Sequence, residues 1–151
     1  MKLTNSISRV RQLTLITSIF LFAFSLTQNA YYTTADSRGG AGTQSLSLLL
    51  IGWLGIFAGQ FSAIAWLANP LLLIAWVLLF DKPIFALVAS ALVLFFMLSF
   101  LTFDKVVVNE AGGLAEITHY GIGYWLWVAS DASLIIGNGY SFLLRKRALI
   151  S

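Results

Sequence analysis

The chain has 151 residues, of which 59% are hydrophobic and only 10% are charged, and its formal net charge is +3. Soluble domains carry about 25% charged residues, so this composition excludes an ordinary soluble domain and predicts one integral membrane domain over residues 1–151. The absence of cysteine excludes disulfides, thiolate metal sites and thiol redox chemistry. The basic excess is an orientation signal in membrane proteins, and we expect no nucleic-acid partner.

The first apolar segment is expected to be an uncleaved signal anchor. Basic residues precede it, as in a signal peptide, but Gln28 disrupts the small-residue pattern of a cleavage site ending at Ala30. Residues 13–32 supply the roughly 20 residues that a transmembrane helix needs. Tyr31 and Tyr32 are then placed as interfacial anchors at its end.

The stretch 45–80 governs the topology because it contains no charged side chain. As one straight helix it would be about 54 Å long, far more than the roughly 30 Å of bilayer hydrocarbon, so it has to break. A break at Gly59-Gln60 leaves a second arm of about 20 residues, whereas a break at Asn69-Pro70 leaves only about 11, too few to span. Length therefore favours Gly59-Gln60.

Two more apolar segments follow. Residues 84–103 form the clearest transmembrane helix, because they contain no charge, and residues 121–144 form the last apolar segment, which ends at three consecutive basic residues. Polar connections at 33–44, 81–83 and 104–120 separate the apolar segments and are expected to be loops or turns.

Lysine and arginine distribution decides between four and five spans. If the long stretch crosses once, at 61–80, seven of the nine basic residues lie on the cytoplasmic side; if it crosses twice, the division is four against five. We therefore predict an all-α membrane protein, a four-span transmembrane helical bundle with a broken or re-entrant second segment, and keep five spans as the alternative. Residues 45–59 are a half-helix in the first case and an extra span in the second. The expected location is the inner (plasma) membrane, with both termini cytoplasmic.

Asp131 is the most informative polar residue, because it lies near the middle of the last apolar segment, where a carboxylate is costly and usually faces the protein interior. No predicted span contains a basic partner, so we expect a neutral carboxyl group near pH 7, since desolvation disfavours its charge. Tyr124 and Asn138, seven residues to either side, share its helix face. With Asn69 and Gln60 they form a candidate intramembrane polar site. It is either a proton-binding or substrate-contacting site, or a structural hydrogen bond from Asp131 to Asn69 or Gln60.

Other features are less specific. Pro70 predicts a kink, and the neighbouring Asn69 amide can compensate the lost backbone hydrogen bond. Gly55 and Gly59 form a pair of small residues four apart, which packing within the chain explains more simply than a dimer face. His119 has too few partners for a metal or haem site, and we expect no cofactor.

No catalytic constellation is recognisable in the sequence. A single membrane aspartate cannot form an aspartyl protease, and no motif supports a serine–histidine pair or a phosphate-binding loop. We therefore expect a non-enzymatic membrane protein that binds another membrane component, as an accessory subunit or an immunity-type protein. The alternative is a small proton-linked transporter or channel built around Asp131. The expected partners are the lipid bilayer and a membrane protein, and a homo-oligomer stays open.

Overall fold

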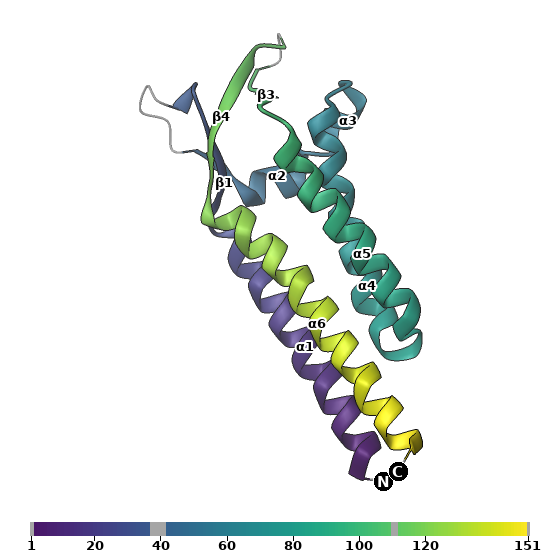
Figure 1. Ribbon diagram of the computed structural model, residues 1–151. Coiled ribbons are helices and arrows are strands. Elements are labelled where there is room, and N and C mark those ends of the chain that lie inside the picture. The colour runs from purple at the N-terminus through teal and green to yellow at the C-terminus, as the bar shows by residue number, and fades with distance from the viewer. Residues whose placement is uncertain (1, 37–41, 110–111, 151) are drawn as a thin grey trace.

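The computed structural model describes residues 2–36, 42–109 and 112–150, and for 2–5 and 147–150 it describes the backbone alone. Within these residues, four long helical segments run alternately in opposite directions, and a small sheet covers one end of them (Figure 1). Both termini and the connection between the second and third segments lie at the other end. The chain is therefore mostly helical, as predicted, but it is not all-α.

The four segments pack as two antiparallel pairs. α1 (Lys2–Leu26) and α6 (Ile122–Ile150) lie side by side along most of their length. α4 (Ala68–Asp81) continues directly from the 3₁₀ helix η2 (Phe61–Leu67) and packs against α5 (Pro83–Ser99). Because the segments alternate in direction, the first and third connections both lie at the sheet end, so the sheet is built from segments far apart in sequence.

Three helical segments are long and apolar enough to cross a membrane, which indicates that the protein associates with one. They are Ser6–Leu26, Phe61–Asp81 and Pro83–Thr102, the last of which includes the short 3₁₀ helix η3 (Phe100–Thr102). In the part of the chain that the structure describes, α6 does not reach this apolarity, because Asp131 and several serines and glycines fall within it. The span predicted at 121–144 therefore stays a prediction.

A four-stranded antiparallel sheet, in the order β2-β1-β4-β3, shows that the all-α prediction was wrong. Its strands are β1 (Asn29–Thr33), β2 (Thr43–Gln44), β3 (Lys105–Val107) and β4 (Leu114–Tyr120). The first span, predicted at 13–32, was also too long, because α1 ends at Leu26 and Tyr31 pairs with Tyr120 of β4. The predicted connections 33–44 and 104–120 thus contribute strands to the sheet.

Helix packing explains why these connections become strands. β1 follows α1 and β4 precedes α6, so the contact between the two helices brings the two strands together at the same end. β-branched and aromatic residues such as Tyr32, Val106 and Ile117 fit a pleated, half-buried surface. Lys105 Nζ and Glu116 Oε1, 3.3 Å apart, form an exposed ion pair between β3 and β4.

The long uncharged stretch breaks at Gly59-Gln60, as its length predicted. α2 (Ser45–Ile51) and α3 (Leu54–Phe57) lie at the sheet end, and the chain then turns before η2 begins. Gly59 makes this turn with φ of 72°, a left-handed conformation that glycine adopts at no steric cost. Residues 45–59 therefore form two short helices and not one half-helix.

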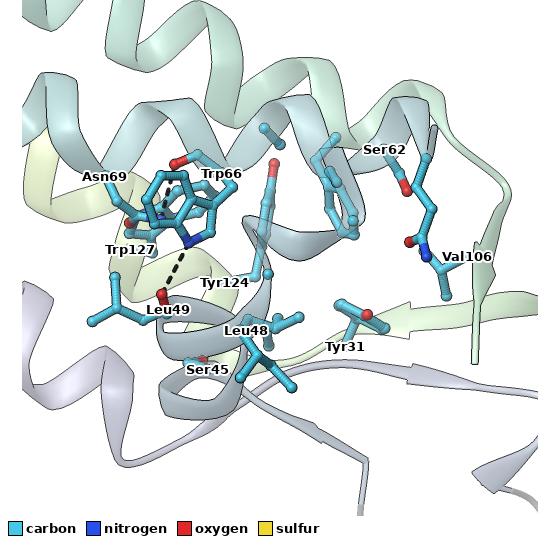
Figure 2. Close-up of a pocket in the computed structure, with 18 of the residues that line it drawn as sticks. Tyr31, Ser45, Leu48, Leu49, Ser62, Trp66, Asn69, Val106, Tyr124 and Trp127 are labelled. Atoms are coloured by element: carbon cyan, nitrogen blue, oxygen red, sulfur yellow. Dashed lines mark hydrogen bonds between the residues drawn. The ribbon is translucent and has the colours of Figure 1, made fainter. Parts of the chain in front are cut away.

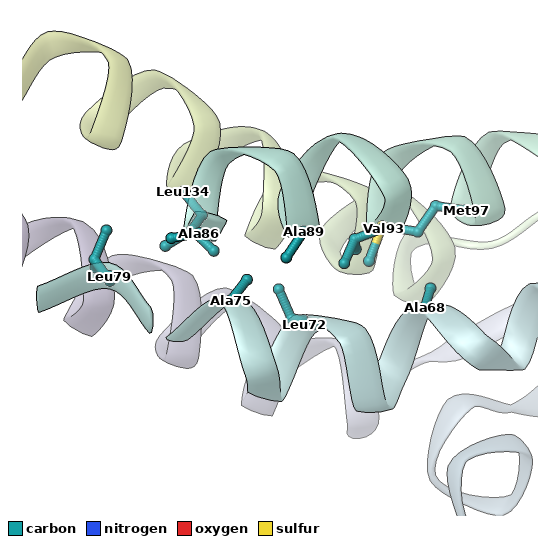
Figure 3. Close-up of a cluster of buried hydrophobic side chains, with 9 residues drawn as sticks. All are labelled: Ala68, Leu72, Ala75, Leu79, Ala86, Ala89, Val93, Met97 and Leu134. Carbon is teal, nitrogen blue, oxygen red and sulfur yellow. The ribbon is translucent and has the colours of Figure 1, made fainter. Parts of the chain in front are cut away.

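The apolar core lies mainly between α4 and α5 (Figure 3). Its side chains recur every three or four residues, so they form facing stripes on the two helices, with one residue added from α6. They are Ala68, Leu72, Ala75, Leu79, Ala86, Ala89, Val93, Met97 and Leu134. The alanines let the two backbones approach closely, which is how helices associate in lipid.

The contact between α1 and α6 relies instead on small polar residues. Those buried on the two helices are Thr14, Ser18, Ser25, Ser130 and Ser141, of which Ser18 accepts a hydrogen bond from Trp76 Nε1 of α4. The closest approach is at Gly137, where an added Cβ would collide with the Thr14 side chain. The absence of a side chain at position 137 is therefore a condition for this helix pair to pack as it does.

Candidate functional site

A cavity of about 510 Å³ lies where the helices meet the sheet (Figure 2). Its walls come from the end of α1, from β1 and β3, from α2, α3 and η2, and from the first turns of α6. Tyr31 and Val106 of the strands lie across the cavity from Trp66 and Asn69. None of the described residues that line it is charged, and most of them are apolar. The cavity therefore suits an uncharged, largely apolar group.

Three hydrogen bonds connect the helices on one side of this cavity. Trp66 Nε1 donates to the Leu49 carbonyl oxygen of α2 over 3.0 Å. Asn69 Nδ2 donates to the Trp66 carbonyl oxygen over 3.1 Å, and Asn69 Oδ1 accepts from Trp127 Nε1 of α6 over 3.1 Å. These contacts join α2, η2, α4 and α6, so the position of each wall depends on Asn69 and the two indoles.

Asn69 forms the first of its hydrogen bonds because of the proline that follows it. Pro70 has no N–H, so it cannot donate to the Trp66 carbonyl four residues earlier, and the Asn69 side chain does so instead. The compensation predicted from the sequence is confirmed. The predicted kink appears as a change of helix type, from 3₁₀ before Ala68 to α after it, which puts Pro70 in the first turn of α4.

Tyrosines close two further sides of the cavity. Tyr124 is only 2% exposed, its hydroxyl donates to the Met97 carbonyl oxygen over 2.9 Å, and its ring contacts Trp127 edge-on. Burial raises the pKa of the Tyr31 phenol, which keeps this side chain neutral. Both tyrosines thus contribute ring surface and no charge.

Gln60 and Ser45, in the cavity wall, have side-chain polar atoms that form no hydrogen bond with any described residue. The Gln60 side-chain amide has no hydrogen-bond partner within residues 2–36, 42–109 and 112–150. The Ser45 hydroxyl oxygen is buried and also lacks a partner there, although it lies against Gly123. An occupant of the cavity can therefore form a hydrogen bond with Gln60 without displacing an existing one, whereas the Ser45 hydroxyl oxygen has no surface open to it.

Asp131 lies outside this cavity, in the interior of the helix bundle. It is fully buried, and its carboxyl group lies near the Ser90 hydroxyl of α5. Neither of these groups makes a well-aligned hydrogen bond with a described residue. The hydrogen bond predicted from Asp131 to Asn69 or Gln60 is not formed, because Trp127, one turn earlier on α6, is the residue that reaches Asn69.

The predicted polar site is therefore divided. Tyr124, Asn69 and Gln60 line the cavity, whereas Asp131 and Asn138 do not. Asn138 Nδ2 donates to the Pro83 carbonyl oxygen over 2.8 Å, which fixes α6 against the start of α5. Its role in the structure is thus a helix–helix contact well away from the cavity.

Sequence reasoning missed Trp66 and Trp127 as members of the site. Their indole N–H groups hold the cavity wall together. The available signal was Asn69 next to Pro70, which indicates a polar contact at membrane depth but does not identify the partner. Gly55 packs against Ala63 of η2, whereas Gly59 is a turn residue, so only one of the two glycines packs as predicted.

His119 lies on the exposed side of β4. Its ring stacks on Tyr32 with 4.3 Å between centroids, and its Nδ1 is 3.2 Å from the Thr118 hydroxyl. Among the described residues there is no group of three or more histidine, aspartate or glutamate side chains placed to hold a metal ion.

None of the protein-family models, characterised proteins or solved structures compared with this chain matches it.

Proposed function

We propose that this is a non-enzymatic, four-span protein of the inner (plasma) membrane that binds another membrane component at its sheet end. The observation that carries the binding proposal is the uncharged cavity between the short helices and the sheet. In cellular terms, the protein is an accessory subunit of a membrane complex or an immunity-type protein.

The exterior of the helices supports the membrane part of the proposal. Large apolar side chains on every long helix are exposed, for example Phe20, Val77, Phe95 and Ile136, at 66%, 73%, 65% and 71%. α6 counts as the fourth span although its sequence is less apolar, because its aspartate and asparagine point into the protein while residues such as Ile136 point outward. Polar side chains inside and apolar ones outside are what a lipid solvent requires.

The distribution of charge supports cytoplasmic termini. Seven basic residues belong to the end of the bundle that holds both termini: Lys2, Arg9, Arg11, Lys82, Arg145, Lys146 and Arg147. Lys105 belongs to the sheet end, and Arg38, also predicted for that side, lies outside the described residues. By the positive-inside rule the sheet then faces away from the cytoplasm.

Site-directed photo-crosslinking tests whether the sheet end binds another component. A photoreactive residue at Phe57, which is 82% exposed on α3, should give a discrete adduct in native membranes, whereas the same residue at Val77 on α4 should react only with bulk lipid. Purification in a gentle detergent should then return the same component. Identical products from both positions, together with a bare monomer after purification, would contradict the proposal.

Asp131 favours one alternative, a proton-linked transporter or channel. A fully buried carboxyl group with no described basic partner is a typical proton-carrying site in membrane proteins. Asp131→Asn decides between the two functions, because the amide keeps a hydrogen-bonding group but cannot exchange a proton. Proton flux in reconstituted vesicles should be absent from wild type and variant alike if the protein only binds; a flux present in wild type and lost in Asp131→Asn would establish the alternative.

A further inference from the structure

We infer that the cavity holds the apolar chain of a membrane lipid whose uncharged carbonyl group is bound by Gln60. This inference rests on the proposed function and names the component that the sheet end binds. The expected ligand has a long hydrocarbon chain and, where the chain meets the polar head, an uncharged carbonyl group. An acyl ester of a glycerolipid and the ring carbonyl of an isoprenoid quinone both supply it.

The chemistry of the wall restricts the occupant to such a molecule. Because no described lining residue is charged, a charged head would have to stay outside the cavity, since an unpaired charge there would lose its hydration. The Gln60 amide offers a free donor, which suits a carbonyl oxygen.

The position of the cavity places it at the depth where lipid chains meet their head groups. α1 ends at Leu26, and η3, which continues α5, ends at Thr102; both ends border the cavity or the strands that cover it. About 20 helical residues span the hydrocarbon layer, so these helix ends mark its boundary on the sheet side. A lipid of that leaflet therefore needs no transfer through water to reach the site.

The outer wall indicates an entrance from the bilayer. Ile51 and Leu54 line the cavity and are also exposed, at 60% and 49%. Phe57 and Phe61, on either side of the Gly59 turn, are 82% and 76% exposed. An opening bordered by large apolar side chains is stable next to lipid and unfavourable in water, so the occupant comes from the membrane.

The volume agrees with a small-molecule site. At about 510 Å³ the cavity falls within the roughly 300–1,000 Å³ typical of ligand pockets. The three hydrogen bonds around Asn69 hold its wall in place whether or not a ligand is bound, so the site is largely preformed.

The test is the lipid content of the purified protein and of two matched tryptophan variants. Leu48 and Leu50 are neighbours on α2, but only Leu48 lines the cavity, while Leu50 is 62% exposed outside it. After washing in mild detergent, native mass spectrometry should find about one lipid per wild-type chain. Leu48→Trp fills the cavity and should reduce the bound fraction about tenfold or more, whereas Leu50→Trp should retain it. Equal retention by both variants, or no lipid on the wild type, would overturn the inference.

A second pair of variants gives an independent result if Leu48→Trp does not fold. Ser62 and Ile64 both lie on η2, and only Ser62 lines the cavity, so Ser62→Phe should lose the lipid and Ile64→Phe should keep it. Thermal unfolding of each variant shows which proteins are folded. Gln60→Leu should weaken lipid binding while Gln44→Leu, on β2, should not; equal binding by these two would exclude the carbonyl contact.

Extraction and mass analysis of the bound molecule separate the two sources, because glycerolipids and quinones differ in mass and in ultraviolet absorption. The outcome also separates this inference from the proposed function. A protein adduct at Phe57 with no lipid in the cavity would refute the lipid site alone, whereas the absence of both would refute the binding function as well.

Discussion

At the scale of single residues, Asn69 is the residue on which the site depends most. Its amide nitrogen replaces the hydrogen bond that Pro70 removes, and its carbonyl oxygen fixes the Trp127 indole of another helix. Both partners are half-buried, and both hydrogen bonds are lost when Asn69 is removed. These two hydrogen bonds explain why a polar side chain is placed at position 69, at membrane depth.

Asn69→Leu should therefore reduce the free energy of unfolding by about 1–2 kcal/mol, because it leaves the Trp66 carbonyl and the Trp127 indole without partners. Trp127→Phe is the matched control, since it removes only the second hydrogen bond and should cost less. Reversible unfolding in mixed micelles measures both values. A stability of Asn69→Leu equal to that of the wild type would show that these hydrogen bonds contribute nothing.

At the scale of elements, the two helix pairs pack by different means. α4 and α5 bury alanines and larger apolar residues, whereas α1 and α6 bury serines, threonine and glycine. Three buried serines, Ser25, Ser130 and Ser141, hydrogen-bond carbonyls of their own helix, as Ser130 Oγ does with the Trp127 carbonyl at 2.6 Å, so their hydroxyl groups are satisfied in a tight contact. The close approach of α1 and α6 then brings β1 and β4 into register at the end of the pair.

Two glycine substitutions on α6 test the close approach. Gly137→Ala adds a Cβ that collides with Thr14, whereas Gly139→Ala meets nothing within 4 Å. Both variants gain the same helix propensity of about 0.8–1 kcal/mol, so their difference isolates packing. We expect Gly139→Ala to be more stable than wild type and Gly137→Ala to be less stable by about 1–3 kcal/mol. Thermal unfolding in detergent provides the comparison, and equal melting temperatures would mean that α1 and α6 are not in close contact.

At the scale of the whole molecule, the basic residues and the cavity lie at opposite ends of the helix bundle. The terminal end carries most of the basic residues, and the sheet end carries the cavity and the short helices. Because the long stretch 45–80 contributes one long helical segment and two short helices at the sheet, the proposed topology has four spans. With five spans, Lys82 and the three basic residues at 145–147 would lie on the opposite side of the membrane from Lys2, Arg9 and Arg11, which the positive-inside rule disfavours.

Cysteine labelling decides the topology, helped by a chain without native cysteine. In intact cells, a membrane-impermeant maleimide should label Glu116→Cys on β4 but should label Lys82→Cys only after permeabilisation. The five-span alternative reverses both results, because it moves Lys82 outside and β4 inside. Denatured samples of both variants, labelled in full, provide the control for reactivity.

Several features were determined by the sequence alone because they depend on near neighbours. The run lengths predicted the long helices, the glycine and glutamine at 59 and 60 predicted the break, and the pair at 69 and 70 predicted the local hydrogen bond. Each of these follows from properties within one or two helical turns.

The sheet, the cavity and the separation of Asp131 from Asn69 were decided only by the tertiary structure. Strand pairing joins residues on opposite sides of the chain's midpoint, and the indole of Trp127 reaches Asn69 across 58 positions. A single sequence carries no signal for which distant residues meet. Whether α6 presents Asp131 or Trp127 to the start of α4 depends on how the packed helices are placed along one another, and close packing, not helical periodicity, sets that placement.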